Sequence, residues 1–416
     1  MQIQKLTLTN VRNFPHAEFT FQPGMNLIVG VNGAGKSTIL DALAATLSFA
    51  LPRFTPSESR PFSLATNDIT LGQTQLTIAL DLLTADFPIT CQLTETQSRA
   101  SFRMTPDNES VLNLAKGHAN QPFVAYFSTR RAYPISQNGS TYKSNGAYQF
   151  VYADALRHRP LNVREFAQWL LVQESLQAEV EGQATVRLAQ MSRLAASFLP
   201  GYTNLQAIAN PTPTLTLDRE GYALDVRYLS DGERNLLSLI LDLTRRLTQA
   251  NPTLDNPIRK GKAVVLIDEL DLHMHPSWQR TVVQRLTNTF PNCQFICTTH
   301  SPQIIGEVSP ECITFIDEGQ ISHPFQSLGM DTNWIVRHLM GTPLRDAKTA
   351  TQLEAIADLI EEEEYDEAEE KIDLIRNAVG DFPELVRLQT QIDMIDFWAE
   401  EFLAEEANNE LEAKLS

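Results

Sequence analysis

The sequence predicts an α/β protein in which a mixed sheet is flanked by helices, with a helical insertion and an acidic α-helical C-terminal extension. Short apolar runs typical of buried strands alternate with stretches of helical periodicity. One such run, residues 27–29, leads through a glycine-rich turn into an apolar helix over about residues 36–51. Residues 349–416 show helical spacing to the end of the chain.

These patterns divide the chain into four predicted segments. The first contains strands and the glycine-rich turn, the second a loop followed by helices over 161–209, the third more strands, and the fourth the acidic helices. Strands are expected at residues 215–217 and 224–228, on either side of the boundary between the second and third segments. The segments are 1–130, 131–222, 223–345 and 346–416.

Composition excludes several classes of protein. The 416 residues are 43% hydrophobic and 20% charged, as in ordinary globular proteins. No stretch approaches the roughly 20 apolar residues of a membrane span, and the first residues alternate like a strand instead of following the pattern of a signal peptide. Four cysteines do not make a disulfide framework. We therefore expect a cytoplasmic enzyme or binding protein that does not contact a membrane.

The net charge of −18 is concentrated at one end. Residues 351–416 contain 21 acidic and 4 basic side chains, whereas the rest of the chain contains 30 acidic and 29 basic ones. Any basic surface for nucleic acid must therefore be local and lie on the body. The acidic end is typical of a solvated helical surface or of a docking site for a basic partner.

The strongest motif is Gly30–Ser37, which fits G-x-x-x-x-G-K-[ST] between a short buried strand and a helix. Its backbone N–H groups would surround phosphate oxygens at a helix N-terminus. Lys36 would contact the β- and γ-phosphates of ATP, and Ser37 would bind Mg²⁺. A chance glycine-rich turn is the alternative, and the full match in this context disfavours it. The other expected nucleotide contacts from this turn are Asn32, Gly33, Gly35 and Thr38.

A second motif places two carboxylates at the end of the apolar run Ala263–Ile267. The carboxyl ends of strands are where open α/β sheets bind ligands. Asp268 suits the Mg²⁺ shell, and Glu269 suits the general base for the attacking water. A strand that ends in two acidic residues is usually just exposed to solvent at that end. The upstream phosphate-binding loop Gly30–Ser37, called the P-loop below, favours the catalytic interpretation.

The order of four motifs resembles the head of an ABC-class ATPase. Leu229–Arg234 is similar to the LSGGQ signature, Asp268-Glu269 to Walker B, Leu270-Asp271 to the D-loop, and Thr298–Ser301 to the switch-histidine loop. The resemblance implies that two chains enclose two ATP molecules. Ser230 and Gly232 of one chain would then contact the γ-phosphate bound by the other chain. Asp271 and His300 would belong to the catalytic set, with His300 sensing the phosphate bound by its own chain.

Two assignments stay open at this point. Arg12 and Asn13 resemble an early position near the nucleotide in SMC-like and RecF-like heads, but an ordinary surface turn fits them almost as well. No glutamine fits the Q-loop: Gln121 precedes a strand, and the segment Ser128–Arg131 follows that strand and could do similar work.

Several variants of this ATPase class are disfavoured. The chain has no long heptad run, so an SMC-type arm is excluded. His273 and His275 could be a metal pair, but the resemblance makes them part of a structural loop. No Asp-x-Asp pair occurs, as the Toprim nuclease of OLD-like proteins would require. We therefore expect no nuclease centre in this chain.

Softer features resemble the PtuA-like ATPases of antiphage defence, found in Septu systems and with some retrons. These features are Phe198–Tyr202, a signature motif that ends in Asp-Gly-Glu-Arg at residues 231–234, the segment Asp268–His273 and the segment Gly329–Trp334. The resemblance implies ATP and Mg²⁺ as cofactors, a homodimer or higher homo-oligomer, and a separate HNH-type (PtuB-like) endonuclease. It also allows a complex with nucleic acid or retron RNA/DNA. The alternatives are a RecF-like repair ATPase without a nuclease partner and an ATP-stabilised scaffold.

The acidic end carries an apolar stripe at spacings of three and four residues. The stripe either packs on the chain's own upstream helix, residues 350–377, or docks a second copy or the nuclease. Its members are Leu385, Leu388, Ile392, Ile395, Ala399 and Phe402.

Overall fold

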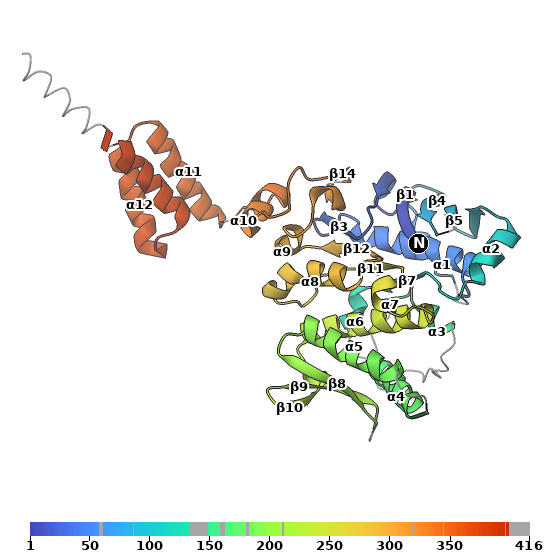
Figure 1. Ribbon diagram of the computed structural model, residues 1–416. Coiled ribbons are helices and arrows are strands. Elements are labelled where there is room, and N and C mark those ends of the chain that lie inside the picture. The colour runs from blue at the N-terminus through green and yellow to red at the C-terminus, as the bar shows by residue number, and fades with distance from the viewer. Residues whose placement is uncertain are drawn as a thin grey trace, which may run out of the picture. The chain divides into compact units, whose positions relative to one another are not determined.

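The computed structural model of the protein divides into two compact units, Met1–Ile335 and Val336–Ser416 (Figure 1). Each unit has a hydrophobic core of its own. None of the helices described is long and apolar enough to cross a membrane. The structure describes residues 1–57, 61–85, 87–132, 149–158, 163–179, 183–209, 212–317, 319–343, 345–395 and 397–398.

A six-stranded sheet forms the centre of the first unit. Its order is β14-β13-β3-β12-β11-β7, and all neighbours are parallel except β14, which pairs antiparallel with β13. Strands β3, β7 and β11 are buried at every residue, as expected for parallel strands covered on both faces. The strands are β3 (Met25–Gly30), β7 (Phe123–Phe127), β11 (Ala263–Ile267), β12 (Cys293–Thr299), β13 (Ile313–Asp317) and β14 (Gln320–Ser322).

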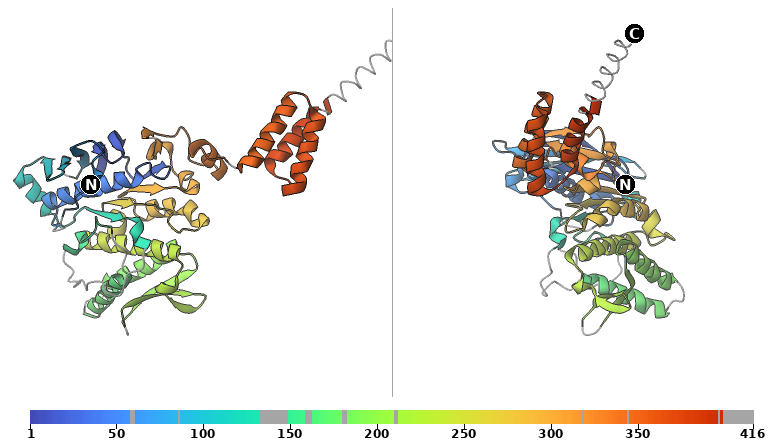
Figure 2. Two further views of the ribbon diagram at one scale, coloured as in Figure 1. Left: turned by 180° about the vertical axis from the view of Figure 1, so that it is seen from behind. Right: turned by 90° about the vertical axis from the view of Figure 1, so that its left-hand side faces the viewer.

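A second, antiparallel sheet has the order β2-β1-β4-β5-β6. Alternate residues of β1, β4 and β5 are buried, so one face of this sheet packs on the core. Helix α1 (Lys36–Phe54) contacts strands of both sheets and lies between them, which explains why it is buried on nearly all sides (Figures 1 and 2). The strands are β1 (Gln2–Val11), β2 (Phe14–Thr20), β4 (Gln75–Leu83), β5 (Pro88–Thr96) and β6 (Ala100–Thr105).

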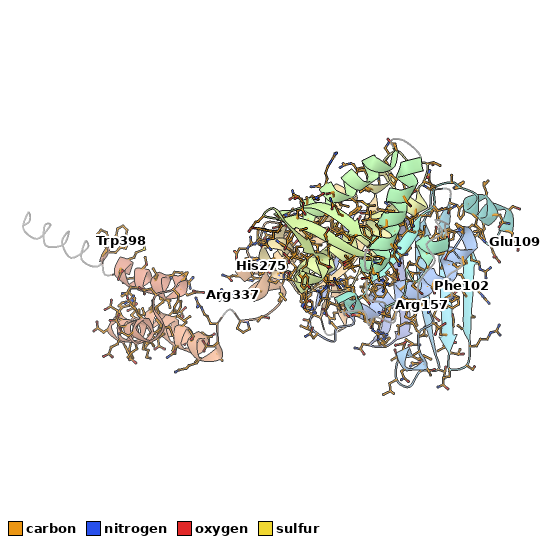
Figure 3. All side chains as sticks on the ribbon, turned by 90° about the horizontal axis from the view of Figure 1, so that it is seen from below. Phe102, Glu109, Arg157, His275, Arg337 and Trp398 are labelled. Atoms are coloured by element: carbon orange, nitrogen blue, oxygen red, sulfur yellow. The ribbon has the colours of Figure 1, made fainter. Side chains whose placement is uncertain are left out.

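An aromatic contact joins the outer strand of the antiparallel sheet to helix α1, and further helices cover the six-stranded sheet. Phe102 of β6, labelled in Figure 3, belongs to the outer strand. Its ring stacks on that of Phe49 of α1 with centroids 5.6 Å apart, which joins this strand to the core helix. On the other side of the six-stranded sheet lie α6 and α8 (Figure 1). The helices are α2 (Glu109–Lys116), α6 (Asp231–Ala250), α7 (Pro257–Lys260), α8 (Pro276–Thr289), α9 (Pro302–Ile305) and α10 (Thr332–Trp334).

The insertion contains helices and a small antiparallel sheet of order β10-β9-β8. The helices expected over residues 161–209 are present up to Phe198, but the end of that range is a strand, so the helical prediction was wrong there. The chain turns at Gly201, whose φ of 89° favours glycine, and Tyr202 and Leu205 of the strand that follows pack with residues of the helices. The elements are α3 (Gln149–Tyr152), α4 (Val163–Glu179), α5 (Gln183–Phe198), β8 (Tyr202–Ile208), β9 (Thr214–Arg219) and β10 (Tyr222–Asp225).

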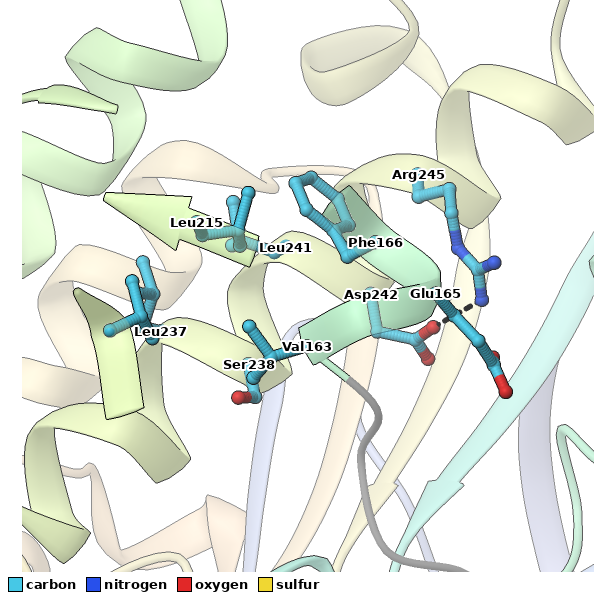
Figure 4. A pocket seen from close by; sticks show the side chains of 10 residues that line it. Val163, Glu165, Phe166, Leu215, Leu237, Ser238, Leu241, Asp242 and Arg245 are labelled. Carbon is cyan, nitrogen blue, oxygen red and sulfur yellow. Dashed lines mark hydrogen bonds and ion pairs between the residues drawn. The ribbon is translucent and has the colours of Figure 1, made fainter. Parts of the chain in front are cut away.

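A small cavity of ≈ 20 Å³ lies among α4, β9 and α6 (Figure 4). Its walls include Phe166 and Leu215, and Arg245 pairs with Asp242 beside it at 2.6 Å. A space of this size holds about one water molecule. It is therefore a feature of the packing and not a nucleotide site.

The second unit is a bundle of α11 (Ala347–Glu361), α12 (Tyr365–Val379) and a helical stretch over residues 383–395. Leu385, Leu388 and Ile392 pack with Ile356 and Ile372 in its core. The apolar stripe therefore packs on the chain's own helices, which confirms the first of the two alternatives for these residues. Ile395 is 37% exposed. Ala399 and Phe402 lie outside the described residues.

Candidate ATP-binding site

The P-loop connects β3 to α1 and has the backbone that a phosphate cradle needs. Gly33 and Gly35 have φ of 84° and 100°, a region that residues with a Cβ rarely adopt. A Cβ on Gly35 would lie 2.6 Å from the ring of Phe14, so only glycine fits there. Lys36 Nζ donates to the carbonyl oxygens of Gly30 and Val31, both at 2.9 Å. Burial lowers the pKa of Lys36, and neighbouring carboxylates oppose that effect.

The two sequence motifs meet at the carboxyl edge of the six-stranded sheet. Ser37 Oγ donates to Asp268 Oδ2 at 3.0 Å, although 231 residues separate them. Thr298 Oγ1 donates to Asp268 Oδ1 at 2.6 Å. A hydroxyl and a carboxylate are the oxygen ligands that Mg²⁺ prefers. The residue types of Ser37 and Asp268 therefore fit Mg²⁺, and these two residues would hold it.

Glu269 stands on a strained turn that other residues hold in place. Its φ is 50°, an uncommon value for a residue with a Cβ. Its N–H donates to Thr298 Oγ1 at 2.7 Å, and its carbonyl oxygen accepts from Arg131 Nη2 at 2.6 Å. Among the described residues, no hydrogen bond engages the Glu269 carboxylate. The carboxylate is therefore available to a water molecule.

Arg131 is a site residue whose role the sequence left unassigned. Its Nη1 donates to the carbonyl oxygens of Phe127 at 3.2 Å, Ser128 at 3.1 Å and Asp268 at 2.5 Å. The side chain is 4% exposed, and burial lowers its pKa to about 10. Because these carbonyls and that of Glu269 engage the guanidinium, Arg131 fixes the turn after β11 and is not poised to contact phosphate.

Gln121 lies at the opposite end of β7 from the nucleotide site. Its Nε2 donates to the carbonyl oxygens of Ala115, Lys116 and His118 at the end of α2. The amino end of β7 begins two residues later, whereas the P-loop and Asp268 are at carboxyl ends of strands. Gln121 is therefore a structural residue and does not act as the Q-loop glutamine.

Asp271 and His300 lie beside the Walker B turn. Asp271 Oδ1 accepts from Thr299 Oγ1 at 2.6 Å and from His300 N at 3.3 Å. His300 is half-buried, and burial, with the nearby Lys36 charge, lowers the pKa of its imidazole. A neutral ring at neutral pH can donate one hydrogen bond to a phosphate oxygen without carrying charge.

Arg12 is held behind the P-loop by acidic partners that the sequence did not indicate. Its Nε contacts Asp68 Oδ1 at 2.6 Å, and its Nη1 contacts Asp41 Oδ2 at 2.9 Å and Thr38 Oγ1 at 3.1 Å. Asp41 also accepts from Tyr126 OH at 3.0 Å. Arg12 thus braces the first turns of α1.

The neighbouring Asn13 touches the cradle itself. Asn13 Nδ2 donates to the carbonyl oxygen of Gly33 at 3.2 Å. His158, from the insertion, lies 3.3 Å from Asp41. Arg12, from the turn after β1, and His158, from the insertion, therefore both contact Asp41 of helix α1. Side chains such as Asp41 and His158 carry no motif that would have identified them.

The signature-like turn begins helix α6. Ser230 is exposed and caps the helix, accepting from Glu233 N at 3.3 Å. A Cβ on Gly232 would lie 2.1 Å from the carbonyl oxygen of His273, so glycine is required where the turn meets the loop after Asp271. In the part of the chain that is described, no hydrogen bond or ion pair joins residues 229–234 to the P-loop.

One of the two histidines of that loop, His275, has a structural contact. His275 caps α8, its Nδ1 accepting from Ser277 N at 3.3 Å. Over the described residues, no cluster of three metal-ligating side chains is found.

The segment that carries this site matches a known family over residues 25–306, described as "AAA domain, putative AbiEii toxin, Type IV TA system". The chain belongs to this family. The matched residues run from β3 to the end of α9 and include both motifs that meet at Asp268. Outside the match remain β1 and β2, the elements from β13 to α10, and the acidic helices of the second unit.

Two curated relatives of this AAA-family chain cover most of its length. The Retron Ec83 probable ATPase of Escherichia coli is 27% identical over 441 aligned residues, which cover 88% of this chain and 81% of the relative. The Septu protein PtuA of Bacillus thuringiensis is 24% identical over 410 residues, covering 93% and 97%. The chain is thus related to PtuA and retron ATPases, as its sequence predicted.

A solved structure shows the same fold. The Smc head bound to the C-winged helix domain of ScpA aligns with a TM-score of 0.50 at 16% identity, covering 79% of this chain and 98% of that one. The comparison confirms the predicted ABC-type P-loop ATPase fold, in which a mixed sheet is flanked by helices.

Proposed function

We propose that the chain is the ATP-binding and ATP-hydrolysing component of a cytoplasmic antiphage defence complex, and that it regulates a separate HNH-type nuclease as a sandwich dimer. The observation that carries the ATPase proposal is the meeting of Ser37, Asp268 and Thr298 beside an available Glu269 carboxylate. The two relatives, a Septu protein and a retron ATPase, support the defence setting.

In the proposed ATP hydrolysis, the P-loop, the Mg²⁺ ligands and Glu269 have separate roles. The backbone of Asn32–Ser37 and the Lys36 ammonium bind the phosphates of the substrate ATP, with Lys36 exchanging its carbonyl partners for phosphate oxygens. Ser37 and Asp268 would hold Mg²⁺, which would supply positive charge beside the transferring phosphoryl group. Glu269 accepts the proton of the attacking water, and Arg131 keeps the backbone of Glu269 in place.

The dimer proposal rests on what the signature turn lacks. Ser230 is an exposed helix start with no described contact to its own P-loop. The turn packs through Gly232 on the loop after Asp271, so signature and D-loop belong to one surface of the chain. A helix N-terminus binds anions well, and a second chain can supply the phosphate. Asp271, Ser230 and Gly232 would then complete the partner's site.

Mixing two inactive chains tests the dimer. Ser230→Arg blocks the signature and Lys36→Ala removes the phosphate-binding charge, so each variant should be inactive alone. A heterodimer has one site with an intact P-loop from the first chain and an intact signature from the second, and ATPase activity should partly return. Ser322→Arg, on the exposed end of β14, controls for the added arginine. Mixtures that co-assemble without recovering activity would refute the sandwich dimer.

A second experiment tests the defence role. The chain would be expressed with its neighbouring genes, and proteins that co-purify would be identified and assayed for nuclease activity. We expect an HNH-type nuclease in the complex and loss of protection against phage in the Lys36→Ala variant. Protection that survives Lys36→Ala would contradict ATP-dependent regulation. Assembly in ATP without turnover would support the ATP-stabilised scaffold instead.

A further inference from the structure

The serine of the signature turn already has its donors engaged by a carboxylate of its own chain. Ser230 N donates to Glu233 Oε2 at 2.9 Å, and Ser230 Oγ donates to the same oxygen at 2.7 Å. These two groups are at the exposed start of α6, where a partner's phosphate would arrive. A phosphate oxygen and the Glu233 carboxylate would therefore compete for the same two donors.

A second set of contacts holds the carboxylate from the side of the small sheet. Tyr202 OH, on β8, donates to Glu233 Oε1 at 3.0 Å, and Arg219 Nη1, on β9, donates to the Tyr202 oxygen at 2.8 Å. The Arg219 guanidinium also lies over the Tyr202 ring, 5.1 Å from its centroid. Burial acts to raise the pKa of Glu233, but hydrogen bonds from Ser230 and Tyr202 outweigh it and lower that pKa. The carboxylate is therefore charged at neutral pH.

These contacts make displacement of the carboxylate feasible. When Glu233 leaves Ser230, the Tyr202 hydroxyl still provides a hydrogen bond, so the charge is not left without a donor. The signature turn can then offer its N–H and O–H to another anion. The cost of this exchange depends on the negative charge of Glu233, because a neutral side chain would hold the serine hydroxyl less strongly.

We propose that Glu233 is an intrachain competitor for the γ-phosphate that the signature turn receives from a partner chain, and that it sets how much ATP-bound protein is needed for dimer closure. The proposal rests on the proposed sandwich dimer and adds a regulatory residue to its site. Tyr202 and Arg219 are the positioning residues that keep the competitor beside Ser230.

The variant Glu233→Gln separates competition from helix capping. The amide oxygen of glutamine can still accept from Ser230 N, so the cap of α6 is retained, whereas the competing charge is lost. A purely structural role therefore predicts unchanged or weaker dimers. Competition predicts tighter ones.

The experiment measures ATP-dependent association by sedimentation velocity. Both parent and variant carry Glu269→Gln to slow turnover, with ATP and Mg²⁺ saturating. We expect Glu233→Gln to lower the dimer dissociation constant roughly tenfold, the factor that corresponds to about 1.4 kcal/mol, because hydrogen bonds to charged groups exceed neutral ones by that order. Calorimetric ATP affinity at protein concentrations below dimerisation should not change, because Glu233 does not contact its own P-loop among the described residues.

Asp225→Asn is the matched control. It removes the same charge from a nearby turn, but Asp225 bonds Arg227 and Thr214 and not Ser230. Its dimer constant should stay within about twofold of the parent. The proposal is overturned if Glu233→Gln dimers, with an unchanged melting curve, are no tighter than the parent, or if Asp225→Asn tightens them equally. A parent that never associates in ATP would overturn the sandwich dimer itself, and the role of Glu233 with it.

Discussion

Replacing Thr298 with valine tests whether one buried hydroxyl holds both the Asp268 carboxylate and the backbone of Glu269 in place. Thr298 is fully buried at the end of β12. Its Oγ1 donates to Asp268 Oδ1 at 2.6 Å and accepts from Glu269 N at 2.7 Å. Valine has nearly the same shape but can make neither bond. The substitution therefore removes the two interactions without opening a cavity.

The size of the effect follows from the two lost bonds. A hydrogen bond to a charged group contributes about 1.5–3 kcal/mol, and leaving a buried N–H without a partner costs about 1–3 kcal/mol. Because neighbouring effects are not additive, we expect the free energy of unfolding to fall by about 3 kcal/mol. The turn at Glu269 has a φ of 50° and would relax, which moves its carboxylate. A displacement of this kind can lower ATP turnover by about a hundredfold.

The assay combines urea unfolding of the full chain with steady-state ATP hydrolysis. Thr46→Val is the matched control, because Thr46 is equally buried and donates only to the Ala42 carbonyl oxygen within α1, at 2.9 Å. Both residues belong to the first unit, so any contribution from the second unit is common to both variants. The control should lose about 1 kcal/mol or less and keep its turnover. Equal losses of stability in the two variants, with turnover preserved in both, would refute the reasoning.

Three further substitutions test neighbouring parts of the site and the fold. Lys36→Ala should abolish ATP binding in a calorimetric titration, because no other described ammonium lies in the P-loop; unchanged affinity would contradict the P-loop assignment. Glu269→Gln should bind ATP normally but hydrolyse it about 10²–10⁴-fold more slowly, and near-normal turnover would exclude Glu269 as the base. Burial raises the pKa of Glu95, so the contribution of this group to stability is present below its unfolded pKa and lost as pH rises through the folded value. Glu95→Gln, which can still accept from Leu64 N, should therefore raise the free energy of unfolding at neutral pH and not at about pH 3 in urea titrations; a gain independent of pH would count against the assignment.

The strand ends of the site could be predicted because each has a local signal. A glycine turn before a helix and an apolar run before two acids each specify one end of a parallel strand, and such ends meet at one edge of a sheet. The structure brings Ser37 and Asp268 together there at 3.0 Å. The fold class follows from the same runs, because strands buried on both faces need helices on both sides.

The supports of the site could not be predicted in the same way. Arg131 donates to the backbone carbonyl oxygens of Asp268 and Glu269, which lie 137 and 138 positions further along the chain. Every residue has such an acceptor, so no sequence pattern indicates this pairing. The acidic partners of Arg12 were not indicated either: two carboxylates on other elements bind its guanidinium, and its contact with the nucleotide stays a prediction. The sequence did not predict β8, because the helical spacing of residues 161–198 continues into this segment. The strand that pairs with it, β9, lies further along the chain.

The charges of the site explain why these supports matter. The carboxylates of Asp268, Glu269 and Asp271 all act on the Lys36 ammonium, so the phosphate cradle is surrounded by negative charge. The same carboxylates also interact electrostatically with the Arg131 guanidinium, but backbone carbonyl oxygens accept its hydrogen bonds. ATP adds further negative charge, and Mg²⁺ at the proposed site of Ser37 and Asp268 would offset it. Glu233 extends this principle to the signature turn. In the proposed composite site, Mg²⁺ would offset the carboxylates beside the P-loop, and Glu233 would have to leave the donors of Ser230, so closure would depend on fully loaded nucleotide.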